Sequence, residues 1–346
     1  MVEKKKTIYD IAREAGVSVS TVSRVLNGHS VVREQTAQKV RALIEKYGFS
    51  PSAVARNLSN KRSSLIGCIL PDITNPFYSS LFSDLERWTT YHDYVLFLAN
   101  TLNDFRLESK YLSIFQERQV EGVFWAGGRI NEVTVNPGYV EEVQTFSEHT
   151  PIVMINGHLK GISCHSVEAN EVDGVYKLVE LLASEGHRNI GYLGGVRGIT
   201  SYEAKIRAFK KKMKELHLPV KSSWIIPGSF DVESGILGFQ GLLAAKTLPS
   251  AVLCVNDLVA IGTVAAANRE GMQVPEDLSV CGFDDIPLSR HFFPDLTTVN
   301  QNYYELARSA MRMMLQLQDG KKTPPRVVVE TLLSVRNSTK RNPFSS

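Results

Sequence analysis

The stretch TIYDIAREAGVSVSTVSRVLNG, residues 7–28, carries the clearest structural signal in the chain. Thr7 followed by Asp10 is typical of a capped helix start, and Gly16 is a typical helix stop. One apolar stripe lies between them, formed by Ile8, Ile11, Ala12 and Ala15. The pattern predicts a first helix of about three turns or fewer, followed by a tight turn.

A second helix is expected to begin after Ser18, which can cap it, and to end at Asn27 and Gly28. Its buried face is expected to hold Val22, Val25 and Leu26. A third helix is expected over residues 33–47, with Gly48 as its stop, and its apolar face holds Ala37, Val40, Leu43, Ile44 and Tyr47. Three short helices joined by tight turns predict a helix-turn-helix head over residues 1–49.

The polar face of the second helix suggests contact with DNA. The residues expected to face mostly outward are Val19, Ser20, Thr21, Ser23 and Arg24. Ser and Thr are poor helix formers in a helix interior, yet here they crowd the first turns, where a recognition helix meets base edges. Short hydroxyl side chains approach phosphates closely, and arginine can pair with guanine. An ordinary surface helix is the alternative, since Ser and Thr are common at helix starts.

The charge of the chain is divided unevenly between its two ends. Residues 1–63 hold 12 Lys and Arg against 5 Asp and Glu, a net charge of +7, whereas the remaining 283 residues hold 27 against 31, a net charge of −4. This asymmetry is expected of a nucleic-acid-binding head on a neutral body. A solvated basic tail is the alternative, but the periodic apolar residues of this segment argue against it.

From Ser64 onward, short apolar runs alternate with helix-length segments. The expected strands cover residues 64–70, 94–100, 122–126, 151–155, 189–194, 250–255 and 278–283. This alternation predicts an α/β body, residues 64–341, with two doubly wound parallel-sheet lobes. A ligand would then lie beyond the carboxyl ends of the strands. Residues 50–63 join the head to this body.

Several classes of protein are not supported by the sequence. No apolar stretch reaches the roughly 18 residues needed to span a bilayer, and the start lacks an apolar signal core, so we expect a cytoplasmic protein. The four cysteines are widely spaced without a CxxC pair, and we expect buried free thiols rather than disulfides or a zinc site: Cys68, Cys164, Cys254 and Cys281.

Catalytic motifs are also lacking. The turn GGVRG, residues 194–198, has neither GxGxxG nor Walker spacing, and no GxSxG or HExxH is found. His158, Cys164 and His165 lack a fourth ligand for a metal. We therefore expect neither an enzyme nor a metal or cofactor site. A periplasmic sugar-binding protein would share the body, but it needs a signal peptide and would not carry the basic head.

The order of motifs resembles the lac repressor and purine repressor family of bacterial transcriptional regulators. After residues 7–28, the likeness continues through YGFSPSAVARNL (47–58), IGCILPDITNPFYSSL (66–81), SAVLCVNDLVAIG (250–262), GMQVPEDLSVCGFDD (271–285), LTTVNQ (296–301) and LLSVRNST (332–339). The resemblance implies a homodimer that binds a near-palindromic operator. It also implies a repressor of a carbohydrate-utilisation operon, with a sugar or sugar derivative bound between two lobes as its effector. A protein coeffector, used by some members, is not indicated but stays possible.

The resemblance also assigns residues for DNA binding. Val19 and Ser20 would be variable base readers, Ser18, Thr21 and Ser23 would contact backbone or bases, and Arg24 would address a guanine. Supporting phosphate contacts would come from Thr7, Tyr9 and Asn27. Without the family, the hinge at residues 50–63 is a mobile linker, too short to be stably helical alone. In the family it becomes a minor-groove helix, with Leu58 as a wedge beside Ala55 and Arg56.

For the body, the resemblance places lobe 1 at about residues 64–161 and 290–322, and lobe 2 at about 162–289 and 323–341. The implied effector site holds Asn75, Phe77, Tyr78, Asn156, Ser201, Lys205, Phe230, Asn256 and Asp284. Asn and Asp at strand ends are more often turn formers than ligand contacts, which is the alternative for each residue alone. Three departures from the family all concern this pocket: Lys205 replaces an arginine, Ala169 and Asn170 replace a common Asp-Asn pair, and Asn156 stands where aspartate or arginine is frequent.

Overall fold

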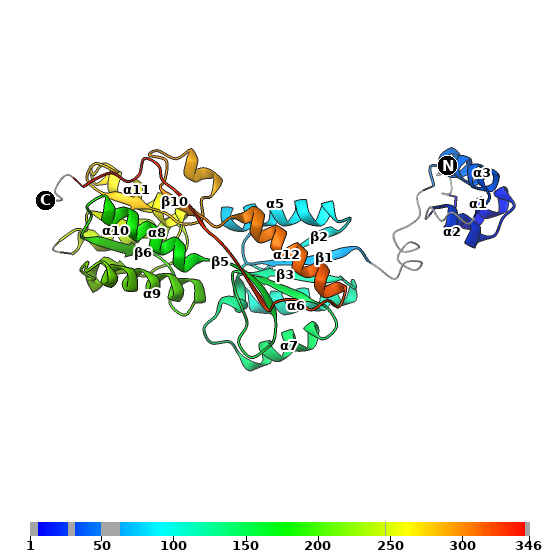
Figure 1. Ribbon diagram of the computed structural model, residues 1–346, viewed down its shortest axis with the longest axis horizontal. Coiled ribbons are helices and arrows are strands. Elements are labelled where there is room, and N and C mark those ends of the chain that lie inside the picture. Colours follow the sequence, from blue (N-terminus) through cyan, green and yellow to red (C-terminus); the bar gives the residue numbers. More distant parts are fainter. Residues whose placement is uncertain (1–5, 27–31, 50–62, 246, 343–346) are drawn as a thin grey trace. The chain divides into compact units, whose positions relative to one another are not determined.

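The computed structural model describes residues 6–26, 32–49, 63–245 and 247–342, and it divides into two compact units, residues 1–63 and 64–346. The first unit contains α1 (Ile8–Ala15), α2 (Val19–Leu26) and α3 (Glu34–Lys46) (Figure 1). These are the three helices that the sequence predicts. Their shared core is formed by Ile11, Ala12, Ala15, Val22, Val25, Ala37 and Val40.

The turn between α1 and α2 follows from local chemistry. Thr7 and Asp10 form a reciprocal capping box, in which each side chain accepts a hydrogen bond from the other residue's backbone N–H. Gly16 ends α1 in the left-handed conformation, with φ of 71°, which only glycine adopts without strain. The turn therefore leads directly into α2, and the buried faces of both helices meet.

The body has two lobes, each with a parallel sheet. The first lobe's sheet has six strands in the order β11-β5-β4-β3-β1-β2, and the second lobe's has four in the order β7-β6-β8-β9. The strands of the first are β1 (Leu65–Leu70), β2 (Val95–Asn100), β3 (Gly122–Ala126), β4 (Ile152–Ile155), β5 (His165–Ala169) and β11 (Arg326–Val329). Those of the second are β6 (Ile190–Leu193), β7 (Ile225–Ile226), β8 (Ala251–Cys254) and β9 (Ser279–Cys281). An antiparallel pair joins β10 (Thr298–Asn300) to β12 (Leu332–Ser334).

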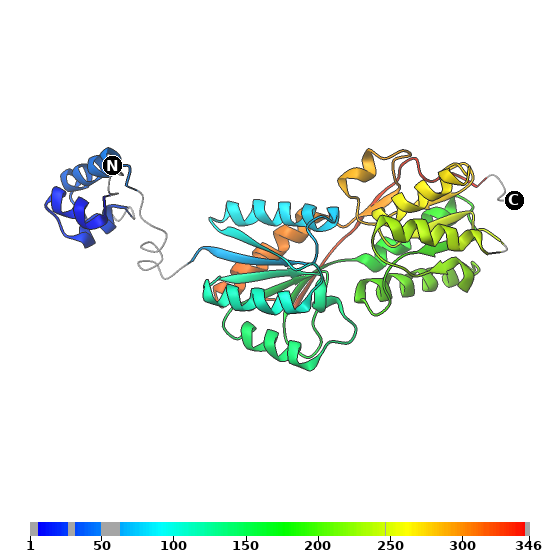
Figure 2. The same cartoon turned by 180° about the vertical axis from the view of Figure 1, so that it is seen from behind.

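Helices cover both faces of each sheet, as Figures 1 and 2 show from opposite sides. In the first lobe, α5 (Pro76–Tyr91) packs with α12 (Tyr303–Gln318), and α6 (Phe105–Glu117) packs with α7 (Pro137–Ser147). Alternate residues of β3 point to opposite faces of the sheet. Phe124 packs in the core under α5 and α12, while Val123 and Trp125 pack in the core under α6 and α7. The buried strands therefore form almost continuous apolar runs.

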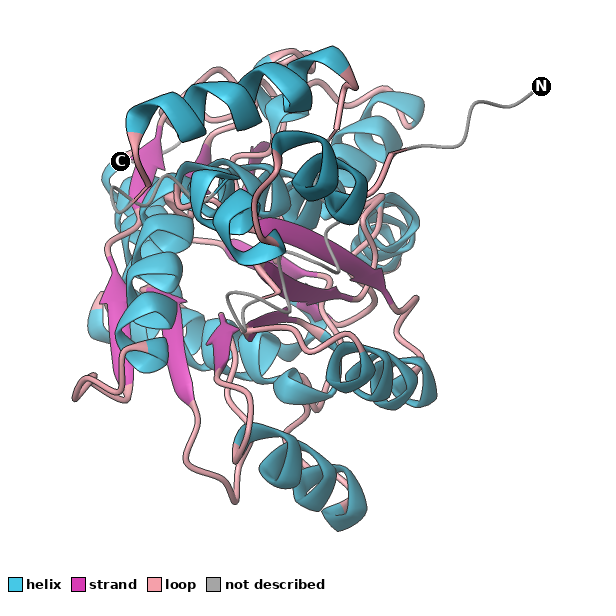
Figure 3. Ribbon diagram, turned by 90° about the vertical axis from the view of Figure 1, so that its right-hand side faces the viewer, coloured by secondary structure: helices cyan, strands magenta, loops and turns pink. Residues whose placement is uncertain are grey.

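The second lobe pairs α8 (Glu171–Ser184) with α9 (Thr200–Glu215), and α10 (Val232–Leu243) with α11 (Asp257–Arg269). Figure 3 shows the strands of the body flanked by helices. Two glycines let α10 and α11 approach closely. A Cβ on Gly235 would lie 2.0 Å from the Val259 carbonyl oxygen, and one on Gly262 would lie 1.9 Å from that of Val232. Short 3₁₀ helices cover Gly128–Asn131, Ser222–Trp224 and Pro287–Arg290.

All seven expected strands are present, but the expected lobe boundaries are wrong. Strands β5 and β11 pair with each other in the first lobe's sheet, although the resemblance implies lobe 2 for residues from 162 and from 323. Residues 290–300, expected in lobe 1, belong to lobe 2, because Leu296 and Val299 lie in its core. The chain therefore crosses between lobes near residues 170, 301 and 330. The sequences HSVEA and RVVV of β5 and β11 mix polar and apolar residues at one end of the sheet, where burial is incomplete.

No helix in the described parts of the chain combines the length and the apolar character needed to cross a membrane. The four cysteines are free thiols, and all but Cys164 are buried. Burial raises the pKa of the Cys68 thiol above its usual range and that of Cys254 to about 12. These thiols are therefore protonated at neutral pH and serve as small apolar core residues.

Candidate functional site

The exposed surface of the head centres on the first turns of α2. Ser20 and Arg24 are exposed, while Thr21 and Ser23 are half-buried. The Ser18 hydroxyl accepts a hydrogen bond from the Thr21 N–H at 3.2 Å and lies 2.8 Å from the Ser20 hydroxyl and 2.9 Å from the Thr21 hydroxyl. Ser18 thus caps the helix as predicted, and three hydroxyls form one connected polar patch at its start.

Val19 departs from its expected orientation. It is half-buried and packs against the core of the head, so the expectation that it faces mostly outward is wrong. The reason is helical geometry, because Val19 lies three residues before Val22 and so shares its face. Ser20 and Arg24, four residues apart, lie together on the opposite, exposed side. The exposed face of α2 is therefore narrower than the sequence suggests.

The other residues expected to contact DNA divide into three groups. Tyr9 is 66% exposed, and the Thr7 side chain is occupied in the capping box. Asn27, Ala55, Arg56 and Leu58 lie outside the described residues. A contact that sequence reasoning missed joins α1 to the end of α3: the Tyr47 hydroxyl donates to Glu14 at 2.9 Å, and Lys46 lies 3.2 Å from the same carboxylate. Hydrogen bonding from Tyr47, then from Lys46, holds the pKa of Glu14 below its usual range.

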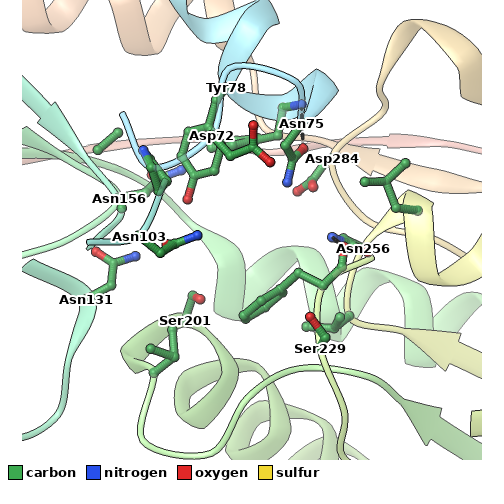
Figure 4. A pocket seen from close by; sticks show the side chains of 18 of the residues that line it. Asp72, Asn75, Tyr78, Asn103, Asn131, Asn156, Ser201, Ser229, Asn256 and Asp284 are labelled. Carbon is green, nitrogen blue, oxygen red and sulfur yellow. Dashed lines mark hydrogen bonds between the residues drawn. The ribbon is translucent and has the colours of Figure 1, made fainter. Parts of the chain in front are cut away.

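A cleft of about 810 Å³ lies in the body at the carboxyl ends of strands from both sheets. Its lining comes mainly from the loops and helix starts that follow strands β1 to β10. This is the position that parallel α/β sheets offer to ligands. All nine body residues singled out from the sequence line this one cleft: Asn75, Phe77, Tyr78, Asn156, Ser201, Lys205, Phe230, Asn256 and Asp284. Figure 4 shows several of these side chains around the cavity.

Three asparagines of this set hydrogen-bond to the backbone of the protein. Asn75 caps α5 by accepting the Phe77 N–H at 3.0 Å. Asn256 caps α11 by accepting the Val259 N–H at 3.0 Å, and its amide donates to the Phe230 carbonyl at 2.8 Å. The Asn156 amide oxygen accepts the Ala169 N–H at 2.7 Å. These contacts fix the three side chains at the cleft wall.

Lys205 is 4% exposed and fully engaged. Its ammonium lies 3.0 Å from the Glu171 carboxylate, donates to the Val255 carbonyl at 3.3 Å and sits 3.8 Å from the centre of the Phe283 ring. Burial of a charge is costly unless the charge is paired and hydrogen-bonded, and both conditions are met here. Lys205 therefore contributes to the cleft as one half of an ion pair.

Asp284 lies at the centre of the polar network in the second lobe. It is 6% exposed, and its Oδ1 accepts a hydrogen bond of 2.6 Å from Gln301 Nε2. Gln301 Oε1 in turn accepts one of 2.6 Å from Asn156 Nδ2. Burial raises the pKa of Asp284 to about 7, against the opposing effect of Lys205. The carboxyl group is thus near its midpoint at neutral pH.

Three hydroxyls of the cleft lining have no hydrogen-bond partner among the described residues, those of Tyr78, Ser201 and Ser229. Burial, followed by the negative charges of Asp284, Glu171 and Asp72, raises the pKa of Tyr78, so its hydroxyl stays protonated and can donate. Phe77 and Tyr78 meet edge to face, with ring centroids 5.0 Å apart. The cleft therefore combines aromatic faces with free hydroxyls and amides, as small polar ligands require.

Sequence reasoning missed several polar residues of the lining: Asp72, Asn103, Asn131, Glu132, Glu171, Ser229, Asp231, Glu233 and Gln301. Asp72 and Gln301 lie inside motifs that were recognised, and Asp231 and Glu233 lie within three residues of Phe230, so their neighbours were a usable signal. Asn103, Asn131 and Glu132 lie in connecting loops without such a signal. Within the described residues, no group of three or more His, Cys, Asp or Glu side chains is arranged to hold a metal ion.

Two family models match the chain. Residues 7–52 match the bacterial regulatory proteins of the lacI family, and residues 179–339 match a periplasmic binding protein-like domain. The first match covers the helices of the head. The second covers most of the second lobe together with the returning segments α12 and β11.

Individual proteins resemble this chain over most or nearly all of its length. Catabolite control protein A of Priestia megaterium is 33% identical over 96% of this chain and 99% of its own length. The lac repressor dimer bound to operator and an anti-inducer aligns with a TM-score of 0.87 over 97% of this chain and 100% of that one, at 24% identity. A LacI-family regulator of Enterococcus faecium with bound ribose aligns with a TM-score of 0.69 over 80% of this chain and 99% of that one, at 25% identity.

Proposed function

The chain belongs to the lacI family of bacterial regulatory proteins, DNA-binding regulators of transcription, and we propose that it represses a carbohydrate-utilisation operon under the control of a sugar-like effector. The proposal of a small-molecule effector rests on the way separate residues meet in the fold. Nine residues that lie far apart along the chain, each marked by a sequence motif, line a single cleft of about 810 Å³. A cleft of this size holds a ligand the size of a sugar.

The effector fits the chemistry of the cleft wall. Tyr78 and Ser201 offer free hydroxyls, Asp284 offers a carboxylate that can accept from sugar hydroxyls, and Phe77 and Phe230 offer apolar faces. A related regulator from Enterococcus faecium has ribose bound, which supports the same class of ligand here. We assign no catalytic role and no cofactor to the cleft. Operator binding would place the protein in the cytoplasm with the chromosome.

The DNA-binding part of the proposal rests on α2. Arg24 and Ser20 would reach base edges, with Val19, Thr21 and Ser23 beside them, and Ser18, Thr7, Tyr9 and Asn27 would contact the backbone. We propose that two copies bind one near-palindromic operator as a homodimer, as the related lac repressor does in its operator complex. Ala55, Arg56 and Leu58 of each copy would enter the minor groove between the two heads.

Fluorescence anisotropy tests this function with the full chain. Labelled DNA from upstream of its own gene is titrated beside random DNA of equal length, at about 50 and about 200 mM salt. The expected result is preferential binding to a pseudo-palindrome of about two helical turns, with affinity falling steeply as salt rises. Equal affinity for promoter-upstream and random fragments would contradict the proposal.

The effector is tested in the same assay. Sugars that relieve or strengthen operator binding are expected to raise the melting temperature of the body, because a ligand that binds the folded state stabilises it. A protein coeffector is the competing possibility. In that case, the protein fraction of a cell extract, freed of small molecules, would change operator affinity. The panel of sugars would leave operator affinity unchanged.

A further inference from the structure

The charge of the cleft constrains its ligand more narrowly than the sugar class does. Six carboxylates and one ammonium group line the cavity, the carboxylates being Asp72, Glu132, Glu171, Asp231, Glu233 and Asp284, and the ammonium that of Lys205. Building on the proposed function, we propose that the effector is a sugar-sized molecule with a protonated amine, such as an amino sugar, whose cation lies between Asp72 and Asp284.

Lys205 leaves no positive charge available to a ligand. Its ammonium is committed to Glu171 at 3.0 Å and to the Val255 carbonyl, and its position over the Phe283 ring keeps it against the second lobe. Glu171 and Lys205 therefore neutralise one another. Five carboxylates remain, and none of them has a described Lys, Arg or His within the 4.0 Å of an ion pair.

Two of these five carboxylates, Asp72 and Asp284, line the part of the cleft that also holds Tyr78 and Asn75. Figure 4 shows Asp72 beside Tyr78 and Asp284 beside Asn75, and the negative charges of Asp284 and Asp72 both raise the pKa of Tyr78. Asp72 uses Oδ1 to accept the Thr74 N–H at 2.9 Å, and Asp284 uses Oδ1 to accept from Gln301. The second oxygen of each has no described hydrogen-bond donor. Asp284 is more than nine-tenths buried, so its free oxygen is a polar atom with only the cleft to supply a partner.

Carboxylates that face one cavity repel each other more strongly than they would in water, because the surrounding protein screens them less. Burial, and then the charge of Glu171, raises the pKa of Asp284, so its carboxyl group is only partly ionised until a cation stabilises the charged form. An ammonium group would relieve this repulsion and give both free oxygens a charged donor. A phosphate or carboxylate would add a further negative charge where no cation is free to meet it. A neutral hydroxyl can donate to one oxygen but leaves the repulsion in place. The arrangement therefore favours a cationic ligand over its neutral parent and disfavours an anionic one.

The experiment compares matched ligands that differ only in charge. Glucosamine, galactosamine and mannosamine are each measured beside the parent hexose, the N-acetyl derivative and the 6-phosphate, by thermal shift and calorimetry on the full chain. The expected result is at least one amino sugar that binds about tenfold or more tighter than its parent and its N-acetyl form, with no binding of the phosphates.

Asp72→Asn keeps the size and the Thr74 contact of the side chain while removing its charge. It is expected to reduce the preference for the amine over the parent sugar about tenfold, with little change for the parent itself. Glu117→Gln, the same chemical change on the exposed side of α6, serves as the matched control and should leave the preference unchanged.

Three outcomes would overturn the inference: a neutral member that binds as tightly as its amine, a phosphate that binds, or a panel in which no amino sugar binds. The operator titration is independent of all of them. If a neutral sugar releases the operator, the inference of an amine ligand is wrong, but the proposed function is still supported. Failure to prefer operator over random DNA would reject the function itself.

Discussion

Gln301 Nε2 donates a hydrogen bond of 2.6 Å to Asp284 Oδ1, and this contact links the second lobe to the segment that crosses toward the first. Gln301 also accepts from Asn156 at the end of β4, so one amide side chain connects cleft residues of both lobes. A ligand group that binds Asp284 therefore lies next to the side chain that connects the two lobes. We expect Gln301 to couple ligand binding to the relative position of the lobes.

We expect Gln301→Leu to weaken this coupling. The substitution leaves Asp284 Oδ1 and Asn156 Nδ2 without their partner, which should lower the free energy of unfolding by about 1–3 kcal/mol in urea titrations. The change in operator affinity caused by a bound effector should shrink, while operator affinity without effector persists. Gln116→Leu, on the exposed side of α6, is the control and should change stability by less than about 0.5 kcal/mol. An unchanged effector response in Gln301→Leu would contradict the coupling.

Arg24→Ala should remove sequence preference from the head. Loss of a bidentate contact to guanine is expected to cost about 1–3 kcal/mol on the operator and much less on random DNA. Arg24 is exposed on α2, so the thermal stability of the protein should not change. Anisotropy titrations measure the affinity for both DNAs. An equal loss of affinity on both would show that Arg24 contacts the DNA backbone and not a base.

Leu58→Ala tests the minor-groove wedge. We expect specific binding to weaken far more than non-specific binding, because an apolar wedge contributes binding energy only where it kinks the DNA. The measurement is the ratio of operator to random-DNA affinity under matched salt. The role of Leu58 as a wedge would be ruled out by equal losses on the two DNAs.

The raised pKa of Asp284 predicts a pH dependence of stability. Its folded pKa of about 7 lies above the ordinary value of 3.8, so between these pH values the folded state holds a proton that the unfolded state has lost. The contribution of Asp284 to stability therefore falls as pH rises from about 4 to 7, by up to about 4 kcal/mol. Asp284→Asn should gain stability relative to the parent protein over this window, as measured by urea unfolding at several pH values. A constant difference between the two proteins would refute the shift.

Gly262→Ala should separate α10 from α11. The added methyl group would lie 1.9 Å from the Val232 carbonyl oxygen, so backbone must move, and we expect a loss of about 1–3 kcal/mol in unfolding free energy. Gly238→Ala on α10 is the matched control, because its nearest neighbour would be Leu193 Cδ2 at 3.4 Å. That variant should be neutral or stabilised by up to about 1 kcal/mol. Equal behaviour of the two variants would show that close packing at Gly262 is unimportant.

Local sequence signals predicted the helices of the head and most strands of the body. They did not predict to which lobe each segment of the body belongs. Thr7, Asp10 and Gly16 act on their immediate neighbours, so α1 and its turn could be located from them. The short strand β7, with only Ile225 and Ile226, and the mixed sequences of β5 and β11 gave no such pattern. Without β5 and β11, the residues that cross between the lobes near 170 and 330 could not be located, and the boundaries implied by the resemblance were wrong there.

The cleft was predictable in its members but not in its charge. The family motifs mark residues at strand ends, and parallel sheets bring those ends together, so all nine marked residues meet. Glu132 joins them from the segment after a 3₁₀ helix, and Glu171 joins them from the first residue of α8, after a strand that the sequence did not reveal. Lys205 looked like a cation for the ligand, yet the sequence could not reveal that Glu171 holds it at 3.0 Å. Pairing between distant residues is a property of the folded chain.

The three crossings between lobes also bear on the order in which the protein can form during synthesis. The first lobe needs α12 for its core and β11 for the edge of its sheet, and both come from residues 303–329. A growing chain has therefore made nearly all of the second lobe before the first can be completed. A nascent chain that ends before residue 303 lacks part of the first lobe's core. Response to an effector is thus acquired only near the end of translation, after the basic head has long left the ribosome.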